Sequence, residues 1–101
     1  MEFANLHKNI VLLLAKIEVY FLKFIEDKVK KNIEIQSIIV IDNSNQHKKH
    51  KFFDKTKYHL RLEIYSTHLS SLNKIAAQRE IMNLFVEELK HKIHALEIKI
   101  K

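Results

Sequence analysis

Hydrophobic residues recur at three- and four-residue steps over the first part of the chain, which is the spacing of one helical face. The pattern predicts a long amphipathic helix from about residue 4 to residue 31. Lysines near its end suit the negative end of the helix dipole. The residues that carry the pattern are Phe3, Leu6, Ile10, Leu13, Leu14, Ile17, Tyr20, Phe21, Phe24 and Ile25.

The period then changes to two, which is typical of strands with one buried face. In a first strand, isoleucines at 33, 35, 39 and 41 share one parity, and Glu34 and Gln36 take the other. A polar and basic stretch follows. In a second strand, Tyr58, Leu60, Leu62 and Ile64 alternate with His59, Arg61, Glu63 and Tyr65. Two strands with a polar connection predict an antiparallel pair.

Helical spacing returns after Ser66. A short helix is predicted around Leu69, Leu72 and Ile75, and a second one, with Glu80 near its start, around Ile81, Leu84, Phe85 and Leu89. Leu96, Ile98 and Ile100 then alternate with charged residues as a last strand, and His94 shares their parity. The predicted order is α-β-β-α-α-β. A right-handed crossover would set the last strand parallel to the second, with the helices on one face of a mixed sheet.

Length and composition narrow the function. The 101 residues suffice for one domain with a modest core, so residues 1–101 are taken as a single unit. The chain has no Gly, Pro or Cys. Without Gly there is no P-loop, dinucleotide-binding turn or nucleophile elbow, and without Cys there is no thiolate ligand or nucleophile. An enzyme is therefore not expected.

No membrane or secretion signal is predicted. The longest early apolar run, residues 10–15, is shorter than a signal-peptide core and much too short to span a bilayer. The expected location is the cytoplasm. The net charge of +6 favours encounters with acidic partners or nucleic acid without choosing between them.

Several short segments together resemble the BolA family. They are Asp42-Asn-Ser followed by His47, His59-Leu-Arg-Leu with Ser66 ending the strand, Arg79, Glu87-Glu-Leu, and Ile93-His-Ala-Leu96. The similarity runs without gaps from about His59 to Lys99 and more loosely back to about Ile17. The resemblance implies an α+β domain of the αββααβ type, related to the type II KH fold, over about residues 17–101.

The resemblance also implies a function. BolA-like proteins pair with monothiol glutaredoxins, and a [2Fe–2S] cluster is held jointly by the glutaredoxin Cys, a glutathione thiol and the BolA-like partner. The family's main ligand corresponds to His94, and the second ligand corresponds best to His47. The implied role is iron–sulfur delivery or iron and redox regulation. Because this chain has no thiolate, it is expected to bind no cluster alone.

The histidines leave alternatives open. By alternation His59 belongs to the polar face of its strand, where a surface partner role is expected, and it is the alternative second ligand. His94 could be a half-covered strand residue, and His47 a solvated loop residue. Pairs at three-residue spacing, such as His91 and His94, could bind zinc, but a zinc site usually needs four ligands.

The alternative function is binding of DNA as a transcriptional regulator. The candidate contacts are Lys48, Lys49, Lys51 and Arg79. Family members usually have Arg-His-Arg where this chain has Ala77-Gln78-Arg79, which weakens this hypothesis. Alone, the chain is expected to be a monomer or a weak homodimer.

Overall fold

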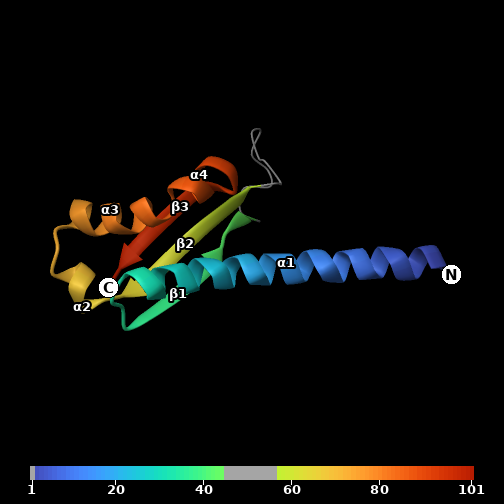
Figure 1. Cartoon of the computed structure of the whole chain (residues 1–101), viewed down its shortest axis with the longest axis horizontal. Helices are drawn as coiled ribbons and strands as arrows, with labels where there is room; N and C mark the ends of the chain where they lie inside the picture. Colours follow the sequence, from blue (N-terminus) through green and yellow to red (C-terminus); the bar gives the residue numbers. More distant parts are fainter. Residues whose placement is uncertain (1, 45–56) are drawn as a thin grey trace.

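The computed structural model describes residues 2–44 and 57–101, and for residues 2–15 it describes the helical backbone. The elements follow the order α1, β1, β2, α2, α3, α4, β3 (Figure 1). Their bounds are Glu2–Asn32 for α1, Ser37–Asp42 for β1, Tyr58–Tyr65 for β2, Thr67–Ser70 for α2, Lys74–Leu84 for α3, Val86–His91 for α4 and Ile93–Ile100 for β3.

The strands form one mixed sheet in the order β1-β2-β3. β1 runs antiparallel to β2, with Ser37 opposite Tyr65 and Asp42 opposite Leu60. β3 runs parallel to β2, and Ile98 lies opposite Leu62. This is the predicted α+β arrangement, in which a helical crossover joins the two parallel strands.

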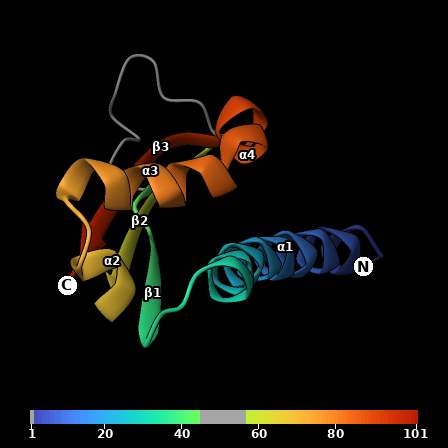
Figure 2. The same ribbon diagram turned by 60° about the vertical axis from the view of Figure 1, so that its left-hand side comes forward.

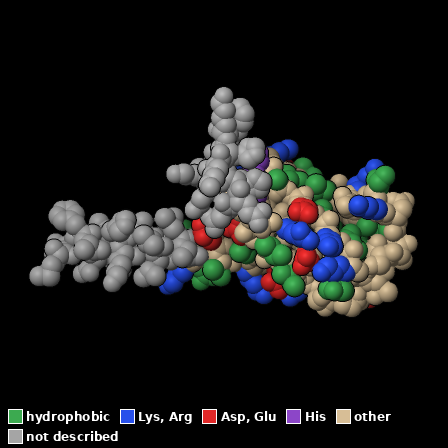
Figure 3. All heavy atoms as spheres, turned by 180° about the vertical axis from the view of Figure 1, so that it is seen from behind, with side chains coloured by type: hydrophobic (Ala, Val, Ile, Leu, Met, Phe, Trp, Pro, Cys, Tyr) green, Lys and Arg blue, Asp and Glu red, His purple; other side chains and the backbone are tan. Residues whose placement is uncertain are grey.

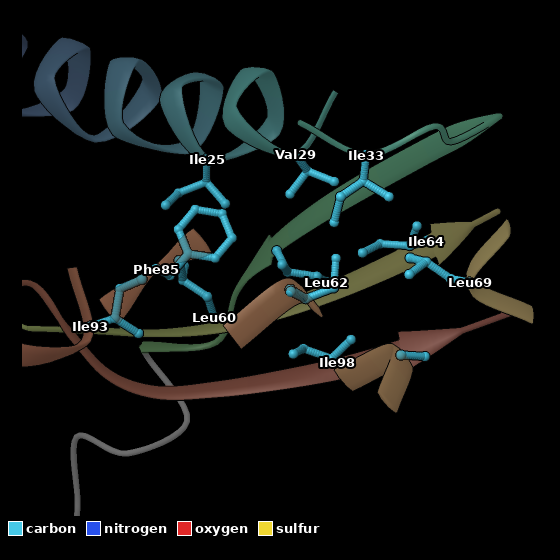
Figure 4. Close-up of a cluster of buried hydrophobic side chains, with 12 residues drawn as sticks. Ile25, Val29, Ile33, Leu60, Leu62, Ile64, Leu69, Phe85, Ile93 and Ile98 are labelled. Carbon is cyan, nitrogen blue, oxygen red and sulfur yellow. The ribbon is translucent and has the colours of Figure 1, made fainter. Parts of the chain in front are cut away.

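The hydrophobic core lies between the sheet and the helices (Figure 4). Ile25 and Val29 of α1, Leu62 of β2, Ile81 of α3 and Phe85 are all fully buried. Buried residues of α1 and α3 share one core cluster with Leu60, Leu62 and Ile64 of β2, so the helices cover one face of the sheet, as predicted. Burying a side chain of this size stabilises the fold by about 1.5–3 kcal/mol relative to leaving it exposed.

The predicted parity of the first strand is wrong. β1 begins at Ser37, after the turn that follows α1, and Ile38 and Val40 pack against the core. Ile39 is 54% exposed on the other face. Residues 38–41 are all β-branched and apolar, so alternation alone could not select the buried face.

The helical region also differs from the prediction. The first predicted helix is a single turn, α2, and Ile75 lies in the next helix, α3, where it is exposed. The second predicted helix is divided into α3 and α4 at Phe85, whose φ of −114° and ψ of 25° are not helical. Phe85 is fully buried, so the division falls where the chain places its largest buried ring in the core.

The opposite face of the sheet carries charged side chains. Arg61 contacts Glu63 at 3.3 Å and Glu97 at 3.5 Å, and Lys101 contacts Glu63 at 3.6 Å. In the view from behind, basic, acidic and hydrophobic side chains lie intermingled on the surface (Figure 3). The described ion pairs make this face a network of opposite charges.

Helix α1 is longer than the body of the protein requires. At 1.5 Å per residue its 31 residues span roughly 46 Å, and its N-terminal half points away from the sheet (Figures 1 and 2). Its C-terminal half supplies Ile25 and Val29 to the core. Within the described ranges, no helix is long and apolar enough to cross a membrane.

Candidate functional site

A β-bulge at the start of β3 positions His94. Tyr58 lies opposite Ile93, but the next residue of β2, His59, lies opposite Ala95. Two steps on β3 therefore match one step on β2, and His94 is the extra residue. Ile93 is buried in the core, and His94 is exposed. The prediction that His94 shares the inward parity of Leu96 is therefore wrong.

The bulge brings His94 beside His59. The centroids of the two imidazole rings lie 4.9 Å apart, with 45° between the ring planes. His59 is 7% exposed, so it lies buried beneath an exposed neighbour. His59 is on the predicted face of β2, together with Arg61, but its burial differs from the surface position that was expected.

The end of β1 holds the strand that carries His59. The Asp42 carboxylate accepts hydrogen bonds from the backbone N–H and the hydroxyl of Ser44, which form a turn. The backbone N–H of His59 donates to Ser44 Oγ at 3.2 Å, and its carbonyl accepts from Asn43 N at 2.7 Å. The Asp42-Asn-Ser segment thus fixes the backbone on both sides of His59.

Two neighbouring imidazoles can serve as metal ligands. Nitrogens about 2.1 Å from one ion, at a tetrahedral angle, place their ring centroids roughly 5 Å apart. The His59–His94 separation fits this requirement. Within residues 2–44 and 57–101, however, no group of three or more His, Cys, Asp or Glu side chains could hold a metal ion. The pair therefore supplies at most half of a four-ligand shell.

Aromatic contacts connect this end of the sheet to α1. The ring of Phe21 stacks on Tyr58 with centroids 4.5 Å apart, and Lys92 Nζ lies 5.8 Å from the Phe21 ring. Partial burial raises the pKa of Tyr58, and the negative charges of Glu18 and Asp42 raise it further. Tyr58 is consequently a neutral packing residue next to the bulge.

An ion pair connects α1 to α4, just before the bulge. Lys28 Nζ lies 2.7 Å from Glu88 Oε1 and also packs over the rings of Phe24 and Phe85. Burial alone would raise the pKa of Glu88, but the hydrogen bond and charge of Lys28, together with a backbone hydrogen bond and the charge of Lys92, lower it overall. Glu88 therefore stays ionised, and the pair fixes α4 against α1.

The structure places some of the other candidate residues. Arg79 is exposed on α3, and Ala77 is buried in the core. His47 lies outside the described residues, as do the lysines proposed to contact DNA, Lys48, Lys49 and Lys51. The DNA-binding hypothesis and the ligand role of His47 stay predictions.

The bulge itself was not predicted, although the sequence contains a signal for it. The residues of β3 that are buried in the core or packed against it are Ile93, Leu96, Ile98 and Ile100, and only the first has an odd number. A change of parity within one strand indicates an inserted residue. Here the inserted residue is the histidine.

Comparisons with known proteins agree with this architecture. The family model described as "BolA-like protein" matches residues 29–101. The BolA domain of SufE1 from Arabidopsis thaliana is 31% identical, with a TM-score of 0.67 over 79% of this chain and 88% of that one. BolA1 from Arabidopsis thaliana is 28% identical, with a TM-score of 0.65 over 79% of this chain and 88% of that one.

A more distant structure shows the same fold. A Bol-like protein from Babesia bovis is 19% identical, with a TM-score of 0.61 over 78% of this chain and 80% of that one. The comparison with curated proteins finds no significant match.

Proposed function

Because this chain belongs to the BolA-like family, we propose that it is a non-catalytic adaptor that shares a [2Fe–2S] cluster with a monothiol glutaredoxin. His94 is the main ligand from this chain. His59 or His47 is the second. The glutaredoxin Cys and glutathione supply the thiolates. The adaptor acts in delivery of the cluster or in iron and redox regulation.

The exposed position of His94 on the bulge is the observation that carries the proposal. A ligand for a shared cluster has to reach beyond the surface of its own protein, and the bulge directs His94 outward while Ile93 anchors the strand in the core. The adjacent ring of His59 packs against the His94 ring. This contact limits the orientations that the His94 ring can take before a partner docks.

The ligand chemistry explains why a partner is needed. Two imidazoles leave the cluster without thiolates, and the chain has no Cys to provide them. Histidine binds iron only in its neutral form, so protonation of the imidazole in acid favours its release from the cluster. A shared site with histidine on one side therefore suits a cluster that is later passed on.

Anaerobic reconstitution tests the proposal. A monothiol glutaredoxin, glutathione, iron and sulfide are combined with this protein, and the cluster is followed by visible circular dichroism. We expect the spectrum to change when the protein is added and to return to that of the glutaredoxin alone with His94→Ala. Separate His59→Ala and His47→Ala variants identify the second ligand by partial loss of the change.

His91→Ala is the matched control. His91 is an exposed histidine of α4, three residues before His94, and its removal should leave the spectrum of the mixed complex unchanged. A mixed complex whose spectrum is the same with His94→Ala as with the unaltered chain would refute the ligand assignment. The absence of any spectral change on adding the protein would refute the adaptor function.

A further inference from the structure

Helix α1 carries a second hydrophobic stripe, and the three members whose side chains the structure describes lie outside the core. Phe21, Ile25 and Val29 face the body of the protein. Ile17 and Tyr20 point to solvent instead, with exposed fractions of 51% and 72%. Phe24 continues this second stripe and is 46% exposed. Large side chains exposed in a row on one helix face mark a surface for a partner.

The second stripe has the spacing of a coiled coil. Its members are separated by alternating steps of three and four residues and fill the a and d positions of a heptad repeat over three heptads. In sequence order they are Phe3, Leu6, Ile10, Leu13, Ile17, Tyr20 and Phe24. The backbone of α1 is helical over this whole range. Such a stripe on a long projecting helix is typical of pairing with another helix.

A groove continues the stripe onto the body. It lies between α1 and α4 and has a volume of about 450 Å³. Tyr20 and Phe24 line one side, and Glu87, His91 and Lys92 line the other. A helix that pairs with the N-terminal half of α1 would reach this groove with its end.

We propose that the partner is a second copy of this chain, bound through α1 in an antiparallel coiled coil. When the position of Ile10 lies opposite that of Leu13 in the second copy, Phe3 lies opposite Tyr20 and Leu6 opposite Ile17. Six layers of the seam are then filled. The two bodies lie at opposite ends of the pair, and the N-terminal end of each α1 covers the groove of the other copy.

Charges next to the seam select the antiparallel orientation. In a parallel pair, Lys23 at a g position would face Lys28 at an e position of the second copy. Lys28 is already paired with Glu88, so Lys23 would gain no acidic partner there. In the antiparallel pair, Lys23 faces Glu2, and Lys16 faces Asn9. Lys23 is exposed, and its ion pairs with Glu26 and Asp27 lie on its own helix, so it can make this contact. Of the two orientations, the antiparallel pair therefore gives Lys23 an acidic partner in the second copy.

Sedimentation equilibrium of the full chain tests the association. We expect a dimer whose dissociation constant rises at least about a hundredfold with Tyr20→Asp, because the substitution buries an unpaired carboxylate at two symmetric positions. The control is Val19→Asp, at a neighbouring residue that is 66% exposed but lies outside the stripe. It should change the dissociation constant by less than about threefold.

Disulfide cross-linking tests the orientation, because the chain has no cysteine of its own. A mixture of Asn9→Cys and Lys16→Cys should form a cross-linked dimer on oxidation, and each variant alone should not. In a parallel pair the two positions lie one heptad apart along the axis, which is too far for a disulfide. Unfolding curves of the variants confirm that the body is intact.

Three results would overturn the proposal. They are a monomer at every concentration, a dimer that survives Tyr20→Asp, and a dimer without the mixed cross-link. A monomer would leave the stripe to a helix of another protein. The spectral change expected with glutaredoxin is measured separately, so failure of the dimer and failure of the adaptor function are distinguishable.

Discussion

His94 and Glu88 show how much of the site is decided by single residues. Glu88 lies in α4 and His94 near the start of β3, and each contacts a residue that is far away in the sequence. The ring of His94 packs against the ring of His59. The carboxylate of Glu88 accepts a hydrogen bond from Lys28, which is 60 residues away. The sequence predicted His94 as a ligand through the family resemblance. The sequence pattern predicted a lysine-rich helix end but not the pairing of Lys28 with Glu88, because contact over such a sequence separation depends on the fold.

The Lys28–Glu88 pair should contribute measurably to stability. Glu88→Gln removes the charge, keeps the shape and leaves Lys28 partly buried beside two aromatic rings. We expect a loss of about 1–2 kcal/mol in the free energy of unfolding, between the values for exposed and buried pairs. Urea unfolding at neutral pH measures it. Glu87→Gln, whose carboxylate is exposed, is the control and should cost less than about 0.5 kcal/mol.

The same pair predicts a dependence on pH. The pKa of Glu88 is lowered from 4.5 in the folded protein, so its ionised form stabilises the fold above that pH. As pH falls through the lowered folded-state pKa, this contribution is lost. The stability difference between the unaltered protein and Glu88→Gln should therefore be largest above about pH 5 and shrink in acid. A difference that stays constant with pH would contradict the assignment.

At the scale of elements, alternation predicted β2 correctly and failed for β1. In β2 every second residue is polar or aromatic, so only one face of the strand is aliphatic and can face the core. In β1 the face is set by pairing, because Val40 lies opposite Leu62 and Ile39 opposite Glu63. The division at Phe85 had no sequence signal, since neither Gly nor Pro marks it. The buried face of β1 and the helix division at Phe85 depend on residues elsewhere in the chain, so neither could be derived from the sequence of that element alone.

Matched substitutions in β1 test which face is buried. Val40→Thr places a hydroxyl against the core and should lower the free energy of unfolding by about 1–2 kcal/mol. Ile39→Thr changes an exposed position on the opposite face and should cost less than about 0.5 kcal/mol. Thermal unfolding of the two variants side by side measures the difference. Equal losses would indicate that the face assignment is wrong.

Ser66 joins two elements at the end of β2. Its hydroxyl caps α2 by accepting from Leu69 N at 3.0 Å and donates to the carbonyl of Glu34 at 2.7 Å. Because the side chain is almost fully buried, Ser66→Ala leaves both groups without this partner. We expect a loss of about 2 kcal/mol from the cap and the carbonyl together. Ser71→Ala, at an exposed hydroxyl after the same helix, is the control in chemical unfolding and should cost less than about half as much.

At the scale of the whole molecule, the body is predicted to fold independently of the projecting half of α1. Among the side chains of α1 that the structure describes, those from Phe21 onward reach the core, and the match to the family model begins at residue 29. A chain that starts at Lys16 should therefore keep the melting temperature of the body within a few degrees. Ile25→Ala should instead cost about 2–5 kcal/mol, because Ile25 is fully buried. Calorimetry compares the two, and a large loss on shortening would mean that the first turns support the body.

The bulge at His94 has a further consequence for how the sheet meets other molecules. β3 is an edge strand, and an unprotected edge offers its free backbone groups to strands of other chains, which leads to aggregation. An inserted residue at one end of β3 interrupts that template, and exposed Lys99 and Lys101 bring charge to the other end. The irregularity that presents the histidine thus also protects the open edge against unwanted strand addition.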